Sequence, residues 1–112
     1  MIDDSINADF WIMANVRRCN ADGIPAMVVH RGDRRGGTLL LKINQFDAGC
    51  KVLTQARDID GVKGWLVAFS GKLVGEVEAD AYIGRAVNRD PDLWVVEIES
   101  SNGTHPFEGN EF

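Results

Sequence analysis

Three arginines in a glycine-rich stretch are the clearest candidates for binding chemistry. Arg31, Arg34 and Arg35 lie in or beside a stretch that also holds three glycines. Guanidinium forks and exposed backbone N–H groups hold phosphates and carboxylates. The stretch lacks the Gly-Lys-Ser/Thr ending of a P-loop and the strand-to-helix setting of a dinucleotide-binding fingerprint. It therefore predicts either a site for an anion or a partner at Arg31, Arg34 and Arg35, or a solvated turn.

Two glutamates near the C-terminal end form a second candidate. Glu97 and Glu99 alternate along a predicted strand, which places their backbones roughly 6–7 Å apart on one face. That separation suits an acid/base pair or a hard metal such as Mg²⁺. The ordinary alternative is a pair of charged residues on the solvated face of a terminal strand. Because the sequence brings no third ligand to them, we expect no metal site.

The histidines and cysteines match no catalytic or metal-binding motif. His30 and His105 have no nucleophile motif nearby, and we expect structural or surface roles for both. Cys19 and Cys50 are too far apart for a CxxC pair and form no zinc-type cluster with the histidines. We expect two semi-buried, reduced thiols and no cofactor.

Composition and charge exclude several classes of protein. The chain has 112 residues, and its net charge of -5 opposes binding to nucleic acid unless basic groups cluster sharply. The acidic N-terminus lacks the pattern of a signal peptide, which favours a cytoplasmic location. The longest apolar run, residues 65–69, is far shorter than the ~20 residues of a membrane span, so we expect no membrane partner.

The spacing of apolar residues predicts the elements that position these candidates. Helical periodicity indicates two helices, and alternating or β-rich runs indicate five strands. The predicted helices cover 8–21 and 76–89, and the predicted strands cover 26–31, 38–44, 50–56, 65–69 and 93–99. Trp11, Trp65 and Trp94 fall in or beside these elements and are expected in the core, or at an interface where one is exposed.

The order of these elements predicts a two-layer α+β fold. The strands at 26–31 and 38–44 are expected to form a hairpin, and short turns extend it to a four-stranded antiparallel β-meander. The C-terminal strand extends this sheet, and the two helices cover one of its faces. Residues 1–99 form the single domain, and residues 100–112 form a polar tail that is mobile unless Phe107 or Phe112 docks.

Three strings in the sequence carry a family resemblance. They are residues 17–20 with 23–26, Arg31-Gly32-Asp33 ahead of Lys42-Ile43-Asn44, and the string Asp90-Pro91-Asp92-Leu93-Trp94 with the strand after it. From about Phe10 to Gly109 the chain resembles the small bacterial family labelled domain of unknown function 1491, and the string that begins at Asp90 is the most specific part. The resemblance implies an identity but neither an activity nor a site.

Two functions of different classes follow from these observations. The first is a binding or protein-interaction module, with self-association through an edge strand as one form of it. The alternative is a small enzyme or metabolite-binding protein that holds an anionic group at the arginine loop and uses Glu97 or Glu99 as acid/base. The enzyme hypothesis requires the loop and the glutamates to line one cleft.

Overall fold

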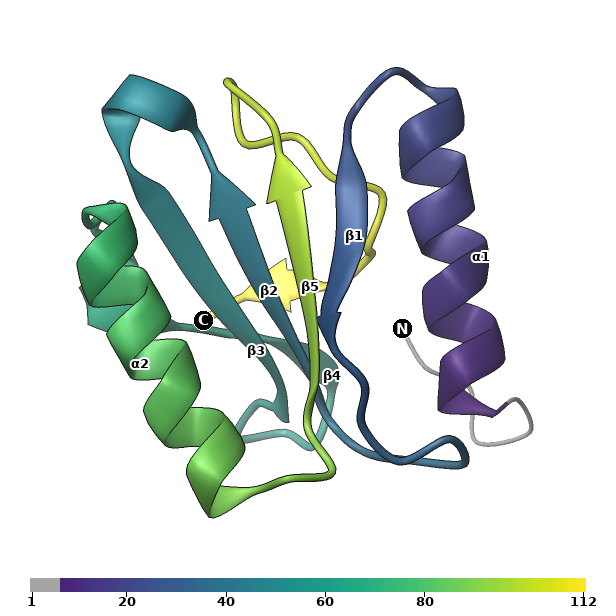
Figure 1. The fold of residues 1–112 in the computed structure, drawn as a ribbon. Helices are drawn as coiled ribbons and strands as arrows, with labels where there is room; N and C mark the ends of the chain where they lie inside the picture. Colours follow the sequence, from purple (N-terminus) through teal and green to yellow (C-terminus); the bar gives the residue numbers. More distant parts are fainter. Residues whose placement is uncertain (1–6) are drawn as a thin grey trace.

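The computed structural model describes residues 7–112 and shows two helices and a six-stranded sheet (Figure 1). The helices are α1 (Ala8–Ala21) and α2 (Glu76–Arg89), and the 3₁₀ turns are η1 (Phe46–Ala48) and η2 (Ala68–Gly71). The strands are β1 (Ala26–His30), β2 (Leu39–Asn44), β3 (Cys50–Arg57), β4 (Lys63–Val67), β5 (Trp94–Glu99) and β6 (Asn110–Glu111). Both predicted helices and all five predicted strands are confirmed, and β6 is additional.

The sheet is mixed, and this corrects the predicted meander. Its strand order is β1-β5-β2-β3-β4-β6, so β5 lies between β1 and β2 and the hairpin predicted for these two strands was wrong. β5 pairs antiparallel with β1 and parallel with β2, while β2, β3 and β4 form the antiparallel part. The physical reason is burial. Residues 93–96 are four consecutive apolar residues whose side chains alternate between the two faces, and only a central strand with both faces covered buries all of them.

The loop between β1 and β2 crosses the start of β5. A Cβ on Gly32 would lie 2.1 Å from the carbonyl oxygen of Asp92, and one on Gly37 would lie 2.6 Å from it. The loop is also fastened there, since the Asp33 N–H donates to that carbonyl and the Trp94 indole N–H donates to the Asp33 carbonyl, at 3.0 and 2.7 Å. The glycines therefore allow a close backbone crossing rather than a tight hairpin.

The two helices pack on opposite faces of the sheet, which corrects the prediction that both cover one face. Residues Ala8, Ile12, Val16 and Cys19 of α1 share a core with Leu39, Leu41 and Ile43 of β2. Residues Ala79, Ile83 and Ala86 of α2 pack instead against Leu40, Val52 and Val95. Successive strand residues point to opposite faces, so these are two separate cores in a helix-sheet-helix arrangement.

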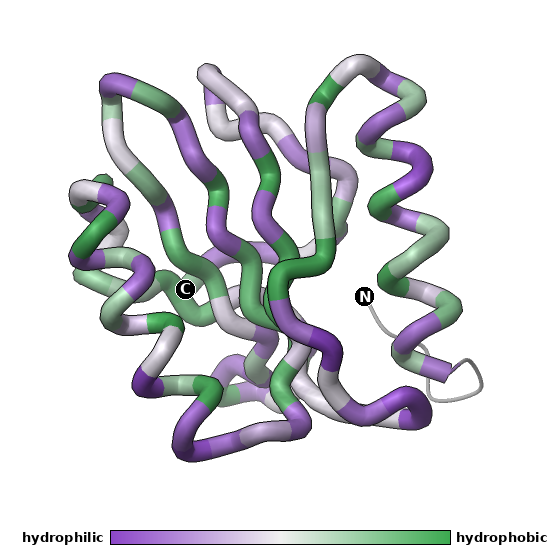
Figure 2. The backbone as a smooth tube through the Cα atoms, viewed as in Figure 1, coloured by the Kyte–Doolittle hydropathy of each residue, from purple (hydrophilic) through white to green (hydrophobic). Residues whose placement is uncertain are grey.

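Hydropathy explains why the sheet needs cover on both sides. β2 begins with three leucines in a row, all 0–1% exposed, so its residues are apolar toward both faces. Figure 2 shows apolar residues alternating with hydrophilic ones along α1 and along the strands. Each helix supplies one apolar stripe, and one helix on each face buries the central strands.

The C-terminal segment completes the core that α1 covers. Phe107 is 3% exposed and packs edge-on against Trp11, with ring centroids 5.3 Å apart. The indole N–H of Trp65 donates to the Glu108 carbonyl at 3.0 Å, and β6 then pairs in parallel with β4. Phe107 therefore docks in the core, which is one of the two contacts that the sequence indicated as able to hold residues 100–112 in place.

The outer edge of β1 is partly occupied by a side chain. The Asn20 amide donates to the Ala26 carbonyl at 3.1 Å and accepts from the Ala26 N–H at 2.9 Å. A β-bulge follows, because the register with β5 shifts between Val28 and His30. Both features oppose the addition of another strand at this edge.

Candidate functional site

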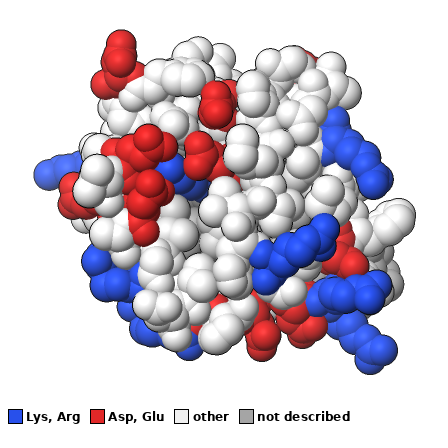
Figure 3. All heavy atoms as spheres, in the orientation of Figure 1, with Lys and Arg blue, Asp and Glu red and all other residues white. Residues whose placement is uncertain are grey.

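A groove lies between the first half of α1 and the loop that follows β1. It encloses about 370 Å³ and is lined by Asn7, Asp9, Phe10, Met13, Arg17, Arg31 and Arg34. Figure 3 shows Lys and Arg side chains gathered at the lower right, over this end of α1 and the loop. Three guanidinium groups and one carboxylate give the groove an excess of positive charge, although the whole chain is acidic. We call this the arginine groove.

Two of the predicted arginines line this groove, each with a specific contact. The guanidinium of Arg31 lies over the Trp94 ring, 5.8 Å from its centroid, within the range of a cation–π contact. Arg34 pairs with Asp9 through its Nε at 3.2 Å, and its side chain is 82% exposed. Such an exposed pair contributes little stability, so a carboxylate from outside can compete with Asp9 for Arg34.

Arg35 does not line the arginine groove. Its backbone N–H donates to the Asp33 carboxylate at 3.3 Å, which shapes the loop. Arg17 takes its place in the lining. Sequence reasoning missed Arg17 as a site residue, although its spacing of seven from Phe10 and four from Met13 places the three on one helical face.

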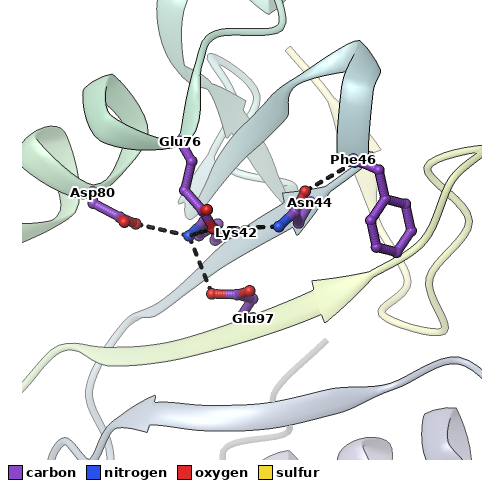
Figure 4. A network of polar contacts seen from close by, with 6 residues as sticks. All are labelled: Lys42, Asn44, Phe46, Glu76, Asp80 and Glu97. Atoms are coloured by element: carbon purple, nitrogen blue, oxygen red, sulfur yellow. Dashed lines mark hydrogen bonds and ion pairs between the residues drawn. The ribbon is translucent and has the colours of Figure 1, made fainter.

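Glu97 belongs to a different cluster, on the face of the sheet that α2 covers (Figure 4). It pairs with Lys42 at 3.1 Å, and the same ammonium group binds Glu76 and Asp80 of α2 at 2.8 Å each. The Lys42 side chain is 4% exposed, whereas those of Glu76 and Asp80 are more than half exposed. The cluster thus ties the start of α2 to β2 and β5 by one buried charge.

The surroundings of Lys42 keep it protonated. Burial lowers the pKa of Lys42, but hydrogen bonds to Asp80, Glu76 and Glu97 outweigh burial and raise the pKa above its ordinary range. A lysine that acts as a nucleophile or base needs the opposite shift. The chemistry of this cluster is therefore structural and electrostatic.

The polar network extends from Lys42 toward the end of β2. The Asn44 amide donates to Glu76 at 3.3 Å and accepts from the Phe46 N–H at 2.9 Å, where the backbone of Phe46 is left-handed with φ 58° (Figure 4). Glu99 is the register partner of Asn44 across β5 and β2. Glu97 is therefore part of this network, and Glu99 lies at the neighbouring register position.

The structure does not bring the glutamates and the arginines together. Trp94, on which Arg31 lies, belongs to the core under α1, whereas Glu97 faces α2. Trp94 and Glu97 are three positions apart on one strand, so their side chains point to opposite faces. Neither glutamate lines the arginine groove. The single cleft that the enzyme hypothesis requires is not formed by these residues.

The histidines have structural contacts. The Nδ1–H of His30 donates to the Leu93 carbonyl at 2.8 Å. The Nδ1 of His105 accepts from the Phe107 N–H at 3.2 Å, and burial lowers the pKa of His105. Both cysteines are unpaired, and both are fully buried rather than semi-buried as expected. Burial raises the pKa of Cys19 and of Cys50, which disfavours the reactive thiolate.

Two further findings bear on the possible ligands. Residues 7–112 contain no group of three or more His, Cys, Asp or Glu side chains that could hold a metal ion. In the same part of the chain, neither helix is long and apolar enough to cross a membrane.

Comparison with known proteins gives the family. The family model described as "Protein of unknown function (DUF1491)" matches residues 6–108, nearly the whole chain. The chain belongs to the DUF1491 family. The crystal structure of a DUF1491 family protein from Caulobacter crescentus CB15 is 32% identical, covers 96% of this chain and 99% of its own, and has a TM-score of 0.83.

Two solution structures extend this comparison. The NMR structure of a DUF1491 family protein from the same bacterium is 32% identical, covers 96% of each chain and has a TM-score of 0.80. Protein Atu0922 from A. tumefaciens is 24% identical over 85% of this chain and 86% of its own, with a TM-score of 0.69, and so supports the fold alone. No match was found among curated proteins. The predicted family is confirmed, and the family's description assigns no activity.

Proposed function

We propose that this DUF1491 protein is a protein-binding module that holds an acidic segment of a partner in the arginine groove. The observation that carries the proposal is the composition of the groove. Phe10 is 70% exposed and lies beside the guanidinium groups of Arg17, Arg31 and Arg34. Aromatic residues, methionine and arginine are the types enriched at the centres of protein interfaces.

The contacts of the arginines also favour binding. Arg31 is oriented by the Trp94 ring before a partner arrives, which lowers the entropic cost of binding. The exposed pair between Arg34 and Asp9 is easily exchanged for a pair with a partner's carboxylate. Asn20 covers part of the outer edge of β1, so the proposal places the partner in the groove rather than along that edge.

The proposal includes a cytoplasmic location. Cys19 and Cys50 are both buried and unpaired. Free thiols of this kind persist in a reducing compartment, whereas secreted domains of similar size are often rich in disulfides.

A peptide-binding experiment tests the groove. The probe is a fluorescein-labelled peptide of alternating Glu and Phe, and fluorescence anisotropy gives its Kd. A charge-assisted hydrogen bond contributes about 1.5–3 kcal/mol, so Arg17→Ala and Arg34→Ala should each weaken binding about tenfold or more. Arg35→Ala is the matched control, because Arg35 is in the same loop but outside the groove lining. Binding should also weaken as salt is raised.

Two results of this experiment would contradict the proposed role of the arginine groove. Equal affinities for the wild type, Arg17→Ala and Arg34→Ala would remove the groove from the proposal. An equal loss in Arg35→Ala would show that only the overall charge of the loop matters.

A further inference from the structure

A second groove lies on the other side of the molecule's sheet, between the C-terminal half of α2 and the start of β2. It encloses about 320 Å³, which is at the lower end of the range of small-molecule pockets. Its apolar floor includes Leu40 and Leu93, which are 1% and 4% exposed. None of the residues that line it lines the arginine groove, so we call it the helix groove.

The rim of the helix groove carries polar side chains that the fold does not use. Thr38, Thr54, Tyr82 and Arg89 all line the groove. Within residues 7–112 none of their side chains forms a hydrogen bond or an ion pair with the rest of the chain. The Tyr82 ring is held in place by Phe69, with centroids 5.2 Å apart. The groove therefore combines an apolar floor with a fixed aromatic wall, hydroxyl groups and a cation.

We propose that the helix groove binds a small aromatic monocarboxylate. Arg89 supplies a planar fork for the carboxylate. Leu40, Leu93 and Tyr82 supply apolar contacts for the ring. The hydroxyl groups of Thr38 and Thr54 hydrogen-bond a polar substituent on the ring. The volume agrees with this class of ligand, since a cavity of about 150 Å³ already holds benzene.

The charge of the rim sets the preference for one carboxylate. Asp90 also lines the groove, beside Arg89. Arg89 is the single cation among the lining residues, so it can pair with one carboxylate, and Asp90 repels a second. A second carboxylate would have to leave water without a cation to receive it, which is unfavourable. The ligand is therefore a monocarboxylate rather than a dicarboxylate.

An NMR titration of the ¹⁵N-labelled full chain tests the proposal. The probe is 4-hydroxybenzoate, and the comparison ligand is terephthalate, which carries a second carboxylate in place of the hydroxyl. We expect 4-hydroxybenzoate to shift the amides of the helix groove, such as those of Leu40, Tyr82 and Arg89. We expect terephthalate to bind at least about tenfold more weakly.

Variants assign the contacts. Arg89→Ala should weaken binding of 4-hydroxybenzoate at least about tenfold, the loss of one charge-assisted contact. Arg85→Ala is the matched control, because Arg85 is an exposed arginine one turn earlier on α2 and does not line the groove. Thr54→Val keeps the side-chain shape and should weaken 4-hydroxybenzoate but not benzoate.

Three results would overturn the proposal. One is the absence of saturable shifts at millimolar 4-hydroxybenzoate in a folded wild-type protein. Another is a set of shifts confined to Arg31, Arg34 and their neighbours, which would place carboxylate binding in the arginine groove. The third is equal binding by the wild type, Arg89→Ala and Arg85→Ala.

Discussion

Replacing Lys42 with methionine removes the positive charge that three carboxylates surround. Removing one partner of a buried ion pair costs about 3–5 kcal/mol, because the other charge stays buried and unpaired. Glu76 and Asp80 are 55% and 57% exposed, so water screens them after the substitution. Glu97 is 17% exposed and is left without its cation. We therefore expect Lys42→Met to lower the free energy of unfolding by about 3 kcal/mol.

Urea unfolding followed by tryptophan fluorescence measures this loss. A loss of about 3 kcal/mol lowers the Tm of a domain of this size by about 10–15 °C. The matched control is Lys72→Met, which changes an exposed lysine just ahead of α2 and should alter stability by less than about 0.5 kcal/mol.

A double variant separates the lost charge pair from lost packing. Lys42→Met with Glu97→Leu removes both buried charges, and apolar replacement of a buried pair is often neutral, so most of the stability should return. The reasoning is refuted if Lys42→Met costs less than about 1 kcal/mol, or if the double variant is no more stable than the single one. Because the pKa of Lys42 is raised in the folded state, this stabilisation is fully present at neutral pH and is lost only as the pH rises through that pKa.

Three further predictions concern the loop after β1, the half-buried His105 and the C-terminal segment. Gly32→Ala should lower the free energy of unfolding in urea by about 1–3 kcal/mol, because its Cβ would collide with the Asp92 carbonyl. Gly36→Ala is the control and should change stability little, since no atom lies closer than 3.9 Å to its Cβ. Burial lowers the pKa of His105, so the unfolded chain binds its proton more readily and stability should fall as the pH drops below about 6.5. His105→Gln should reduce the difference between urea midpoints at pH 7.5 and pH 5, and an unchanged difference would contradict this cause. Phe107→Ala should cost about 3–5 kcal/mol by calorimetry or urea unfolding, since Phe107 is 3% exposed; a loss under 1 kcal/mol would show that residues 1–99 fold without it.

The candidate site was only partly predictable from the sequence. The glycines around Arg31 and Arg34 marked a loop in which arginines could bind an anion. Arg17 joined them through the packing of α1 beside that loop, and the helical spacing from Phe10 was the available signal. The partner of Glu97 could not be found in the same way, because Lys42 is 55 positions earlier and reaches it only through the pairing of β2 with β5.

The sequence by itself determined where the two helices and five of the strands form, and which apolar face each helix buries. Local periodicity is enough for this, because each amphipathic element carries its own apolar face. Tertiary structure decided that β5 lies between β1 and β2 and that the helices cover opposite faces. The apolar run from Leu93 to Val96 is compatible with any central position, and the choice depends on contacts between residues far apart in the chain. That choice places the arginines and Glu97 on different sides of the molecule, and it separates the arginine groove from the helix groove.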